Sequence, residues 1–239
     1  MRNVEHIMGL PISLDLRGGP RPGAVRAAFD WLREVDRRFS PFRPDSEVSR
    51  FGQGTPSAEL AEIVALCERY EAASGGAFRA WLPGRGFDPC GVVKGWAVQR
   101  AGEILRAAGA DRFCLNAGGD VLTAGEPETG RPWRVGVRHP DQPMRVCAVL
   151  EVRDGAVATS GAYERGRHVV DGRTGRPVVE LVSLTVVAGD LTTADATSTA
   201  AFAMGRAGIA WAAAQPGCLV HAVDAGRRVH RSDNLVVTA

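Results

Sequence analysis

The sequence has no strong excess of charge of either sign and no long apolar run. It carries 29 basic and 27 acidic residues in 239, a formal net charge of +2, which argues against a strong electrostatic attraction to nucleic acid or to an anionic membrane. Nowhere do about 18 apolar residues follow one another, so we expect no transmembrane helix and no membrane insertion. Glu5 and His6 stand where a signal peptide would need its apolar run, so we also expect no secretory leader.

Cysteine-based metal motifs and the usual nucleotide-binding motifs are absent too. The five cysteines are odd in number, scattered and without metal-ligand spacing (Cys67, Cys90, Cys114, Cys147 and Cys218). Scattered cysteines of this kind are typically small buried residues of proteins in a reducing compartment, so we expect a cytoplasmic protein. The sequence contains no G-x-x-x-x-G-K-[ST] loop and no G-x-G-x-x-G motif after a strand, which excludes the common phosphate-binding loops.

The composition, 45% hydrophobic and 23% charged, is typical of a globular protein. Apolar spacings of three and four predict helices, and Ser57 is the expected cap of one that ends at Gly75-Gly76. Apolar runs between turns predict strands and a closing hairpin. Helices and strands mix without regular βαβ alternation, so we expect an α+β fold with a largely antiparallel sheet. No linker is visible, so we expect residues 1–239 to form a single domain. The other helices are expected at residues 25–39, 96–108, 194–204 and 207–215, and the strands at 12–16, 112–115, 133–137, 145–152, 156–159, 168–170 and 181–188. The closing hairpin is expected to join 219–223 to Val229 through the turn Ala225-Gly226.

The stretch Phe87–Gly125 contains the central unit of the chain. It opens with Asp88, places Lys94-Gly95 at the head of the helix over 96–108, and ends in a turn, 116–120, that carries two glycines. Paired glycines let the backbone approach a ligand closely. An ordinary loop–helix–strand unit is the alternative interpretation of this stretch taken alone.

A second polar cluster lies at the start of the helix expected near residue 194. Asp195 and Thr199 are four residues apart, so on a helix they share a face and can hold one hard cation together. A carboxylate and a hydroxyl form an oxygen-only ligand set of the kind that Mg²⁺ prefers. The alternative is that Thr192 or Thr193 caps the helix and that Asp195 lies in its first turn for dipole reasons.

A third cluster is the segment His168-Val169-Val170-Asp171. An isolated histidine in such a setting is more often a structural hydrogen-bonding residue than a catalyst. Taken together and in order, however, these segments form a set with others along nearly the whole chain. The set comprises Met8-Gly9, 39–42 with 46–50, 76–78, 88–98, 116–120, 158–161, 168–171 with 174–175, and 194–200.

This set resembles the ApbE family, the FAD:protein FMN transferases. The resemblance implies an ApbE-like, T-fold-related α+β domain with a flavin-binding cleft. It further implies Mg²⁺-dependent cleavage of the FAD pyrophosphate, transfer of FMN through a phosphoester to a Ser or Thr hydroxyl of a partner flavoprotein, and release of AMP. No nucleic-acid partner is expected.

By position, the resemblance also implies the roles of individual residues. The expected FAD contacts are Met8, Phe42, Ala77, Phe78, Arg79, Asp88, Lys94 and Val169. The expected metal ligands are the carbonyl of Gly91 with Asp195 and Thr199, and Thr192 as a further oxygen. His168 matches a histidine associated with the transfer step. These roles agree with the chemistry, because pyrophosphate cleavage builds charge that a metal and a lysine can neutralise, and a neutral histidine can accept the hydroxyl proton near pH 7.

Three positions depart from the pattern of the family. Arg79 stands where an acid is usual after Ala-Phe, Gly172 where Pro is usual, and Phe42 where Tyr is common. The chain is also short and lacks the signal and lipid-anchor segment of many members. Because the metal residues and Lys94 are present, an active enzyme is favoured. The alternatives are an FAD pyrophosphatase that passes FMN to water, and an FAD-binding protein without turnover, which the arginine makes conceivable.

Overall fold

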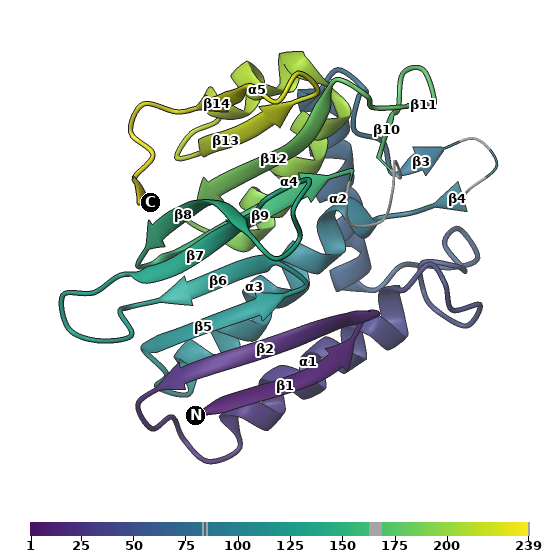
Figure 1. The fold of residues 1–239 in the computed structure, drawn as a ribbon. Helices are drawn as coiled ribbons and strands as arrows, with labels where there is room; N and C mark the ends of the chain where they lie inside the picture. Colours follow the sequence, from purple (N-terminus) through teal and green to yellow (C-terminus); the bar gives the residue numbers. More distant parts are fainter. Residues whose placement is uncertain (83, 85, 163–168, 239) are drawn as a thin grey trace.

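The computed structural model describes residues 1–82, 84, 86–162 and 169–238. Its main feature is an eight-stranded sheet in which all neighbouring strands of the described residues pair antiparallel (Figure 1). In spatial order the strands are β1 (Arg2–Ile7), β2 (Leu10–Arg17), β5 (Arg112–Ala117), β6 (Asp120–Ala124), β9 (Gly155–Gly161), β12 (Leu181–Ala188), β13 (Leu219–Asp224) and β14 (Val229–Arg231).

Five helices in the described residues complete the main architecture, together with a second, smaller sheet. The helices lie behind the large sheet in the view of Figure 1, whereas β7 and β8 lie in front of it. The helices are α1 (Ala24–Phe39), α2 (Ala58–Ala73), α3 (Cys90–Ala107), α4 (Leu191–Ala203) and α5 (Arg206–Ala213). The smaller sheet has the order β15 (Val237–Thr238), β8 (Val146–Val152) and β7 (Trp133–Arg138). Two short hairpins, β3 (Trp81–Leu82) with β4 (Gly86–Phe87) and β10 (Val170–Asp171) with β11 (Arg176–Pro177), lie on the right of the same view.

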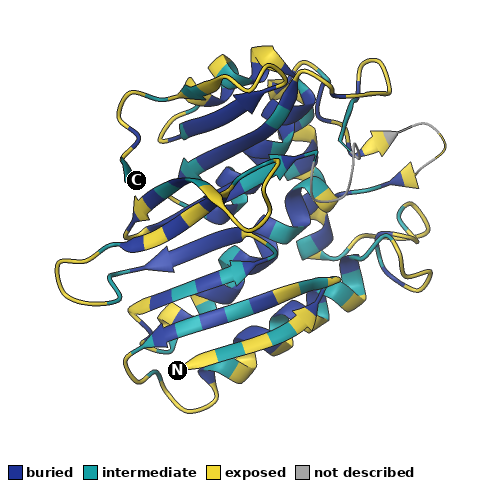
Figure 2. Ribbon diagram, viewed as in Figure 1, coloured by how far each residue is buried: buried dark blue, intermediate teal, exposed yellow. Residues whose placement is uncertain are grey.

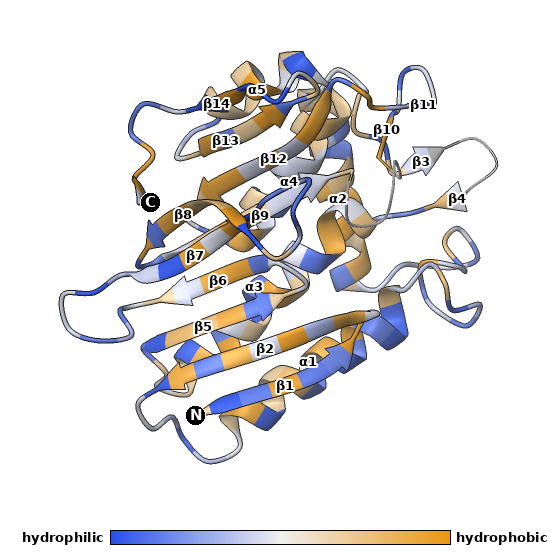
Figure 3. Ribbon diagram, viewed as in Figure 1, coloured by the Kyte–Doolittle hydropathy of each residue, from blue (hydrophilic) through white to orange (hydrophobic). Residues whose placement is uncertain are grey.

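Burial on both faces distinguishes β6 from the edge strand β1. All five residues of β6 are buried, because Leu122 belongs to the core under the helices while Val121 packs against the smaller sheet (Figure 2). β1, in contrast, has a largely exposed and hydrophilic sequence (Figure 3). A strand covered on both faces can hold a charged side chain in the interior only if that charge is paired. Asp120, the first residue of β6, is such a side chain.

The α+β class and the largely antiparallel sheet are confirmed, and most elements lie close to the expected positions. β12 has the expected bounds, and the side chain of Ser57 caps α2 by accepting a hydrogen bond from the amide of Leu60 at 3.2 Å. The expected strand at 12–16 lies within β2, but its partner β1 was not predicted. The starts of two helices were wrong. The central helix begins at Cys90, so Lys94 lies inside it, and α4 begins at Leu191 with Asp190 as its cap.

The cap of α4 decides between the two interpretations of Asp195, as a metal ligand or as an acid near the helix start. Asp190 accepts the amide of Thr193 at 2.8 Å, so neither Thr192 nor Thr193 caps the helix. No acidic residue lies in the first turn of α4. A helix-dipole role therefore does not explain Asp195. In the part of the chain that the structure describes, no helix is long and apolar enough to cross a membrane.

Candidate active site

A cavity of about 630 Å³ collects side chains from segments far apart in the sequence. It is bounded by the β1–β2 and β5–β6 turns, the loop after α1, the start of α3, the end of β9 and one face of α4. Ten of the residues predicted from the sequence line it. They are Met8, Phe42, Phe78, Arg79, Asp88, Gly91, Lys94, Val169, Asp195 and Thr199. The volume lies in the range of about 300–1,000 Å³ that is typical of small-molecule sites.

Lys94, Asp120 and Asp195 form a charge cluster at this cavity, from α3, β6 and α4 respectively. The ammonium Nζ of Lys94 contacts Oδ2 of Asp120 closely and lies 3.5 Å from Oδ1 of Asp195. Both carboxylates are almost fully buried, with exposed side-chain fractions of 2% and 3%, whereas Lys94 retains 27%. Two buried acids face one base, so the cluster carries an uncompensated negative charge when both acids are ionised.

A backbone amide fixes each carboxylate of the charge cluster. The amide of Thr159 donates to Oδ1 of Asp120 at 3.0 Å, and the amide of Gly95 donates to Oδ2 of Asp195 at 2.8 Å. Burial raises the pKa of Asp195, an effect that Lys94 opposes and Asp120 reinforces. Burial by itself would lower the pKa of Lys94, but the charges of Asp120 and Asp195 outweigh it and raise that pKa.

Glycine at positions 91 and 95 allows α3 and α4 to approach closely. A Cβ at Gly95 would lie 2.6 Å from Cβ of Asp195 and 2.6 Å from the carbonyl oxygen of Leu191. A Cβ at Gly91 would lie 2.7 Å from the Phe78 ring and 2.9 Å from Cγ2 of Thr199. Any side chain at these positions would separate the two helices, although glycine weakens a helix interior by about 1 kcal/mol relative to alanine. The glycines therefore bring Lys94 of α3 beside Asp195 of α4.

Hydroxyl groups extend the polar wall of the cavity beyond the charge cluster. Ser160 of β9 lies 3.0 Å from the hydroxyl of Ser198 and 3.4 Å from that of Thr199, and Ser198 donates to the carbonyl of Asp195 at 3.0 Å. The described residues contain no group of three or more His, Cys, Asp or Glu side chains that could hold a metal. A cation here would therefore rely on the Asp195 carboxylate together with neutral oxygens, such as the hydroxyl of Thr199, and such a set suits Mg²⁺.

The outer wall of the cavity, formed by Met8, Phe42, Arg79, Asp88 and Val169, is not buried. Phe42 exposes 82% of its surface. Met8 has a φ of 56°, which is uncommon for a residue other than glycine and places it in the tight β1–β2 turn. Asp88 accepts the amide of Cys90 at 3.0 Å, next to the start of α3. Large, partly exposed side chains of this kind can contact a ligand without rearranging the core.

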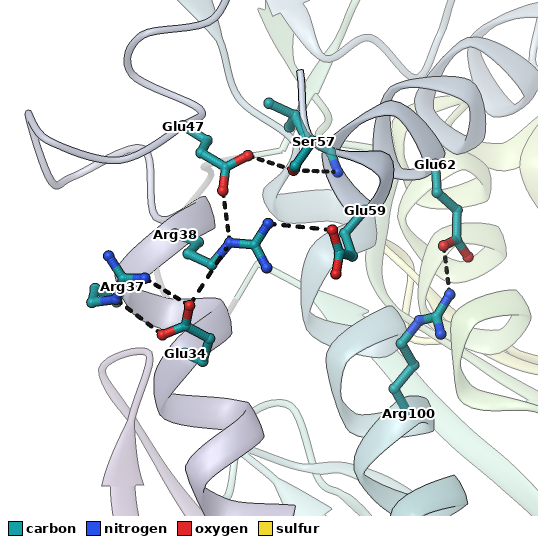
Figure 4. A network of polar contacts seen from close by, with 9 residues as sticks. Glu34, Arg37, Arg38, Glu47, Ser57, Glu59, Glu62 and Arg100 are labelled. Atoms are coloured by element: carbon teal, nitrogen blue, oxygen red, sulfur yellow. Dashed lines mark hydrogen bonds and ion pairs between the residues drawn. The ribbon is translucent and has the colours of Figure 1, made fainter. Parts of the chain in front are cut away.

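An ion-pair network holds the loop that carries Phe42, as Figure 4 shows. Arg38, near the end of α1, donates to Glu47 of the loop at 2.6 Å and to Glu59 of α2 at 3.3 Å. Glu47 in turn accepts the hydroxyl of Ser57, the cap of α2, at 2.5 Å. One arginine thus joins two helices to the segment between them, and this fixes one side of the cavity.

Two of the three departures from the family pattern contact each other. The amide of Gly172 donates to the carbonyl of Ala77 at 2.8 Å, and a Cβ at position 172 would lie 2.6 Å from Cβ of Arg79. Proline has no amide hydrogen and carries extra atoms, so it fits neither contact. The guanidinium of Arg79 pairs with Glu71 at 3.1 Å. Any residue other than glycine at position 172 would therefore meet Cβ of Arg79 and backbone oxygens, a restriction that the sequence alone did not indicate.

The structure does not bring all the predicted residues to the cavity. Ala77 is fully buried behind Phe78, and Thr192 is not among the lining residues. His168 lies outside the described residues, so its role stays a prediction. Asp171 engages Arg173, which lowers the pKa of that carboxyl through hydrogen bonds that outweigh its partial burial. The sequence interpretation had assigned no role to Asp120, although the acid after a Gly-Gly turn was a visible signal.

The chain is similar to known proteins of one family. A model of the ApbE family matches residues 8–83 and 79–221. The FAD:protein FMN transferase of Vibrio cholerae is 26% identical over 238 residues, which cover 73% of this chain and 71% of that protein. The FAD:protein FMN transferase of Haemophilus influenzae is 25% identical over 244 residues, 73% of this chain and 70% of that protein. The structure of the flavin transferase ApbE from Vibrio cholerae superposes with a TM-score of 0.84 at 23% identity, covering 98% of this chain and 97% of that one, which shows a common fold.

Proposed function

This chain belongs to the ApbE family, and from this premise we propose that it is a Mg²⁺-dependent FAD:protein FMN transferase. It cleaves the pyrophosphate of FAD, attaches FMN through a phosphoester to a Ser or Thr hydroxyl of a partner flavoprotein, and releases AMP. The observation that carries this proposal is the charge cluster at a cavity of about 630 Å³, since buried charge of both signs suits a reaction at phosphoryl groups.

The outer wall and Phe78 bind FAD in this proposal. Phe42 and Phe78 offer aromatic surface to the flavin ring, and both line the cavity. Asp88 is tied to the backbone at the start of α3, so its position is fixed before a ligand arrives. Ala77 supports this wall from behind through its hydrogen bond with Gly172, and we leave Thr192 out of the site because it does not line the cavity.

Asp195, Thr199 and the carbonyl of Gly91 would hold Mg²⁺. When bound, the ion neutralises charge that develops on the phosphoryl oxygens and orients the leaving group. The residues fit this role because the buried cluster of Asp120, Asp195 and Lys94 has two acids and one base, so that one negative charge is left for a cation. In addition, Gly91 and Thr199 lie against each other at the same cavity. Oδ2 of Asp195 is occupied by the amide of Gly95, so Oδ1 is the oxygen on the side of Lys94.

Lys94 supplies a fixed positive charge next to the reacting phosphoryl group. The acceptor hydroxyl must lose its proton as it attacks phosphorus, and His168 is the proposed acceptor of that proton. Val169, the next residue in the sequence, lines the cavity. As the acceptor oxygen bonds to the FMN phosphorus, the bond between that phosphorus and the bridging oxygen breaks, and AMP leaves with the bridging oxygen.

Incubation of the purified protein with FAD and Mg²⁺, with and without a Ser/Thr acceptor peptide, tests this function. We expect AMP release and covalent attachment of flavin to the peptide. AMP release with free FMN as the only flavin product would identify an FAD pyrophosphatase. FAD binding without any AMP would identify a binding protein, and either result would overturn the transferase.

We further propose that residues 1–239 form one domain and that the protein is cytoplasmic. The first proposal is supported by the large sheet, which runs from β1 near the N-terminus to β14 near the C-terminus. The second rests on the sequence, since five scattered cysteines are typical of a reducing compartment.

A further inference from the structure

The charge cluster divides its contacts unequally between the two acids. Lys94 makes its close contact with Asp120, whereas it lies 3.5 Å from Oδ1 of Asp195, beyond the usual length of a charge-assisted hydrogen bond of about 2.7–2.9 Å. The ammonium is therefore held by the acid on the sheet and only approached by the acid on α4. A lysine side chain is long and rotatable, so a specific anchor is needed to keep it there.

The fold fixes that anchor before any ligand binds. Asp120 follows a two-residue turn, Gly118-Gly119, whose φ values of 60° and 103° are both in the left-handed region, as a type I′ hairpin turn requires. The side chain of Asn116 closes the turn by accepting the amide of Gly119 at 2.9 Å. Oδ1 of Asp120 is occupied by the amide of Thr159, which leaves Oδ2 for the lysine. Asp120 is thus aimed at Lys94 by backbone contacts on both sides.

Lys94 is also the single lysine of the chain, because the other 28 of the 29 basic residues are arginine. A compact ammonium can lie between two carboxylates at one point, whereas the planar guanidinium of arginine spreads its five donors over a wider fork. The one lysine therefore stands where three side chains, from α3, β6 and α4, converge. The position between the two carboxylates therefore suits an ammonium.

From these contacts we infer that Asp120 is a positioning residue of the transfer reaction: it holds Lys94 away from Asp195 and so leaves the Asp195 carboxylate available to Mg²⁺. This inference rests on the proposed function. Without the negative charge of Asp120, Lys94 pairs with Asp195 and competes with the cation for the same oxygen. Asp120 itself touches neither the metal nor the substrate in this scheme, so it acts only through the lysine.

The variant Asp120→Asn separates charge from architecture. Its amide oxygen still accepts the hydrogen bond from Thr159, so the hairpin keeps its anchor, while the charge that holds Lys94 is gone. A matched control is Asp154→Asn, because Oδ1 of Asp154 likewise accepts one backbone amide, that of Gly125 at 2.8 Å, and this pair lies outside the residues that line the cavity. Circular dichroism and thermal unfolding establish that both variants are folded.

The first measurement needs neither metal nor turnover. Incorporation of ¹³Cε-lysine gives a protein with one labelled side chain, since Lys94 is the only lysine. In metal-free protein we expect Asp120→Asn to shift this signal strongly and Asp154→Asn to leave it unchanged. An identical signal in wild type and Asp120→Asn would overturn the inference, because Asp120 would then not determine the surroundings of the ammonium.

The second measurement is the Mg²⁺ concentration that gives half-maximal AMP release from FAD. We expect Asp120→Asn to raise it about tenfold or more, with the maximal rate recovered within a few-fold at high Mg²⁺. In a Lys94→Met background the same change should alter the midpoint by less than about twofold, because the competitor is absent. Equal effects in both backgrounds, or a maximal rate that no Mg²⁺ concentration restores, would refute the positioning role. Wild-type activity without Mg²⁺ dependence would instead refute the metal in the proposed function.

Discussion

The charge cluster and the outer wall of the cavity are built in different ways. In the cluster, each acid is buried and receives a backbone amide, Thr159 for Asp120 and Gly95 for Asp195. In the outer wall, the comparable ion pair joins Arg79 and Glu71, two side chains that each expose about a third of their surface. A substitution in the cluster leaves a buried charge or a backbone amide without its partner, whereas the partly exposed side chains of the wall stay in contact with water when one of them changes. Substitutions in the cluster should therefore have larger effects than those in the wall.

The largest effect is expected for Asp195→Asn. The amide oxygen can still accept the Gly95 amide, so the fold persists, but the charge available to Mg²⁺ is lost. We expect AMP release to fall by about 10²–10³-fold, the scale of several kcal/mol of metal stabilisation. The measurement is the initial rate of FAD cleavage at one Mg²⁺ concentration, with thermal unfolding as the control for folding. A rate equal to that of wild type would remove Asp195 from the metal site.

Lys94→Ala should follow in size. It leaves two buried carboxylates without their positive counter-charge and removes the cation near the phosphates, so FAD affinity and AMP release should fall together by about 10–10²-fold. Fluorescence titration with FAD and the rate of AMP release measure the two quantities. Lys94→Arg is the matched variant that keeps the charge. We expect it to restore less than half of the FAD binding free energy that Lys94→Ala loses. Unchanged FAD affinity in the alanine variant would place Lys94 outside the ligand site.

Gly172→Pro tests the outer wall where Gly172 contacts Arg79 and Ala77. Proline removes the hydrogen bond to Ala77 and collides with Arg79, so we expect a loss of about 2 kcal/mol in the free energy of unfolding and weaker FAD binding. The Mg²⁺ midpoint should not change, because the charge cluster is not involved. The measurements are urea unfolding and FAD titration. A shift in the Mg²⁺ midpoint as large as that of a cluster variant would contradict the separation of the two regions.

The smallest effect is expected for Ser57→Ala. It removes the cap of α2 and one hydrogen bond to Glu47, so the free energy of unfolding should fall by about 1 kcal/mol. The maximal rate of AMP release should stay within about twofold of wild type, since Arg38 still holds Glu47. Urea unfolding and steady-state kinetics measure these two outcomes. A large loss of rate would mean that the loop carrying Phe42 depends on this single hydroxyl.

The sequence predicted the parts of the fold that show regular apolar spacing, such as α1 and β12. It did not predict β1, because this exposed edge strand lacks an apolar face. The start of α3 was placed too late, since Gly91 and Gly95 weaken helix propensity while they serve a contact with α4 that only the folded chain reveals.

Tertiary contacts also limited what the sequence could predict of the candidate site. Residues within one segment, such as Asp195 and Thr199, could be paired from helical spacing alone. The contact of Lys94 with Asp120 joins α3 to β6 and has no local signal in the sequence. The contact between Gly172 and Arg79 is likewise tertiary, so the sequence did not reveal that these two departures lie side by side.

The crossing of α3 and α4 at Gly95 has a consequence for how this enzyme can diversify. One helix carries Gly91 and Lys94 and the other carries Asp195 and Thr199, so their separation at the crossing sets the spacing between lysine and carboxylate. A single methyl group at position 95 would widen that spacing and could not be offset by a neighbouring change, because it meets backbone as well as side-chain atoms. The residues at this crossing are therefore more tightly restricted than the loops and hairpins around the opening, and we expect new substrate preferences to arise in those loops and hairpins.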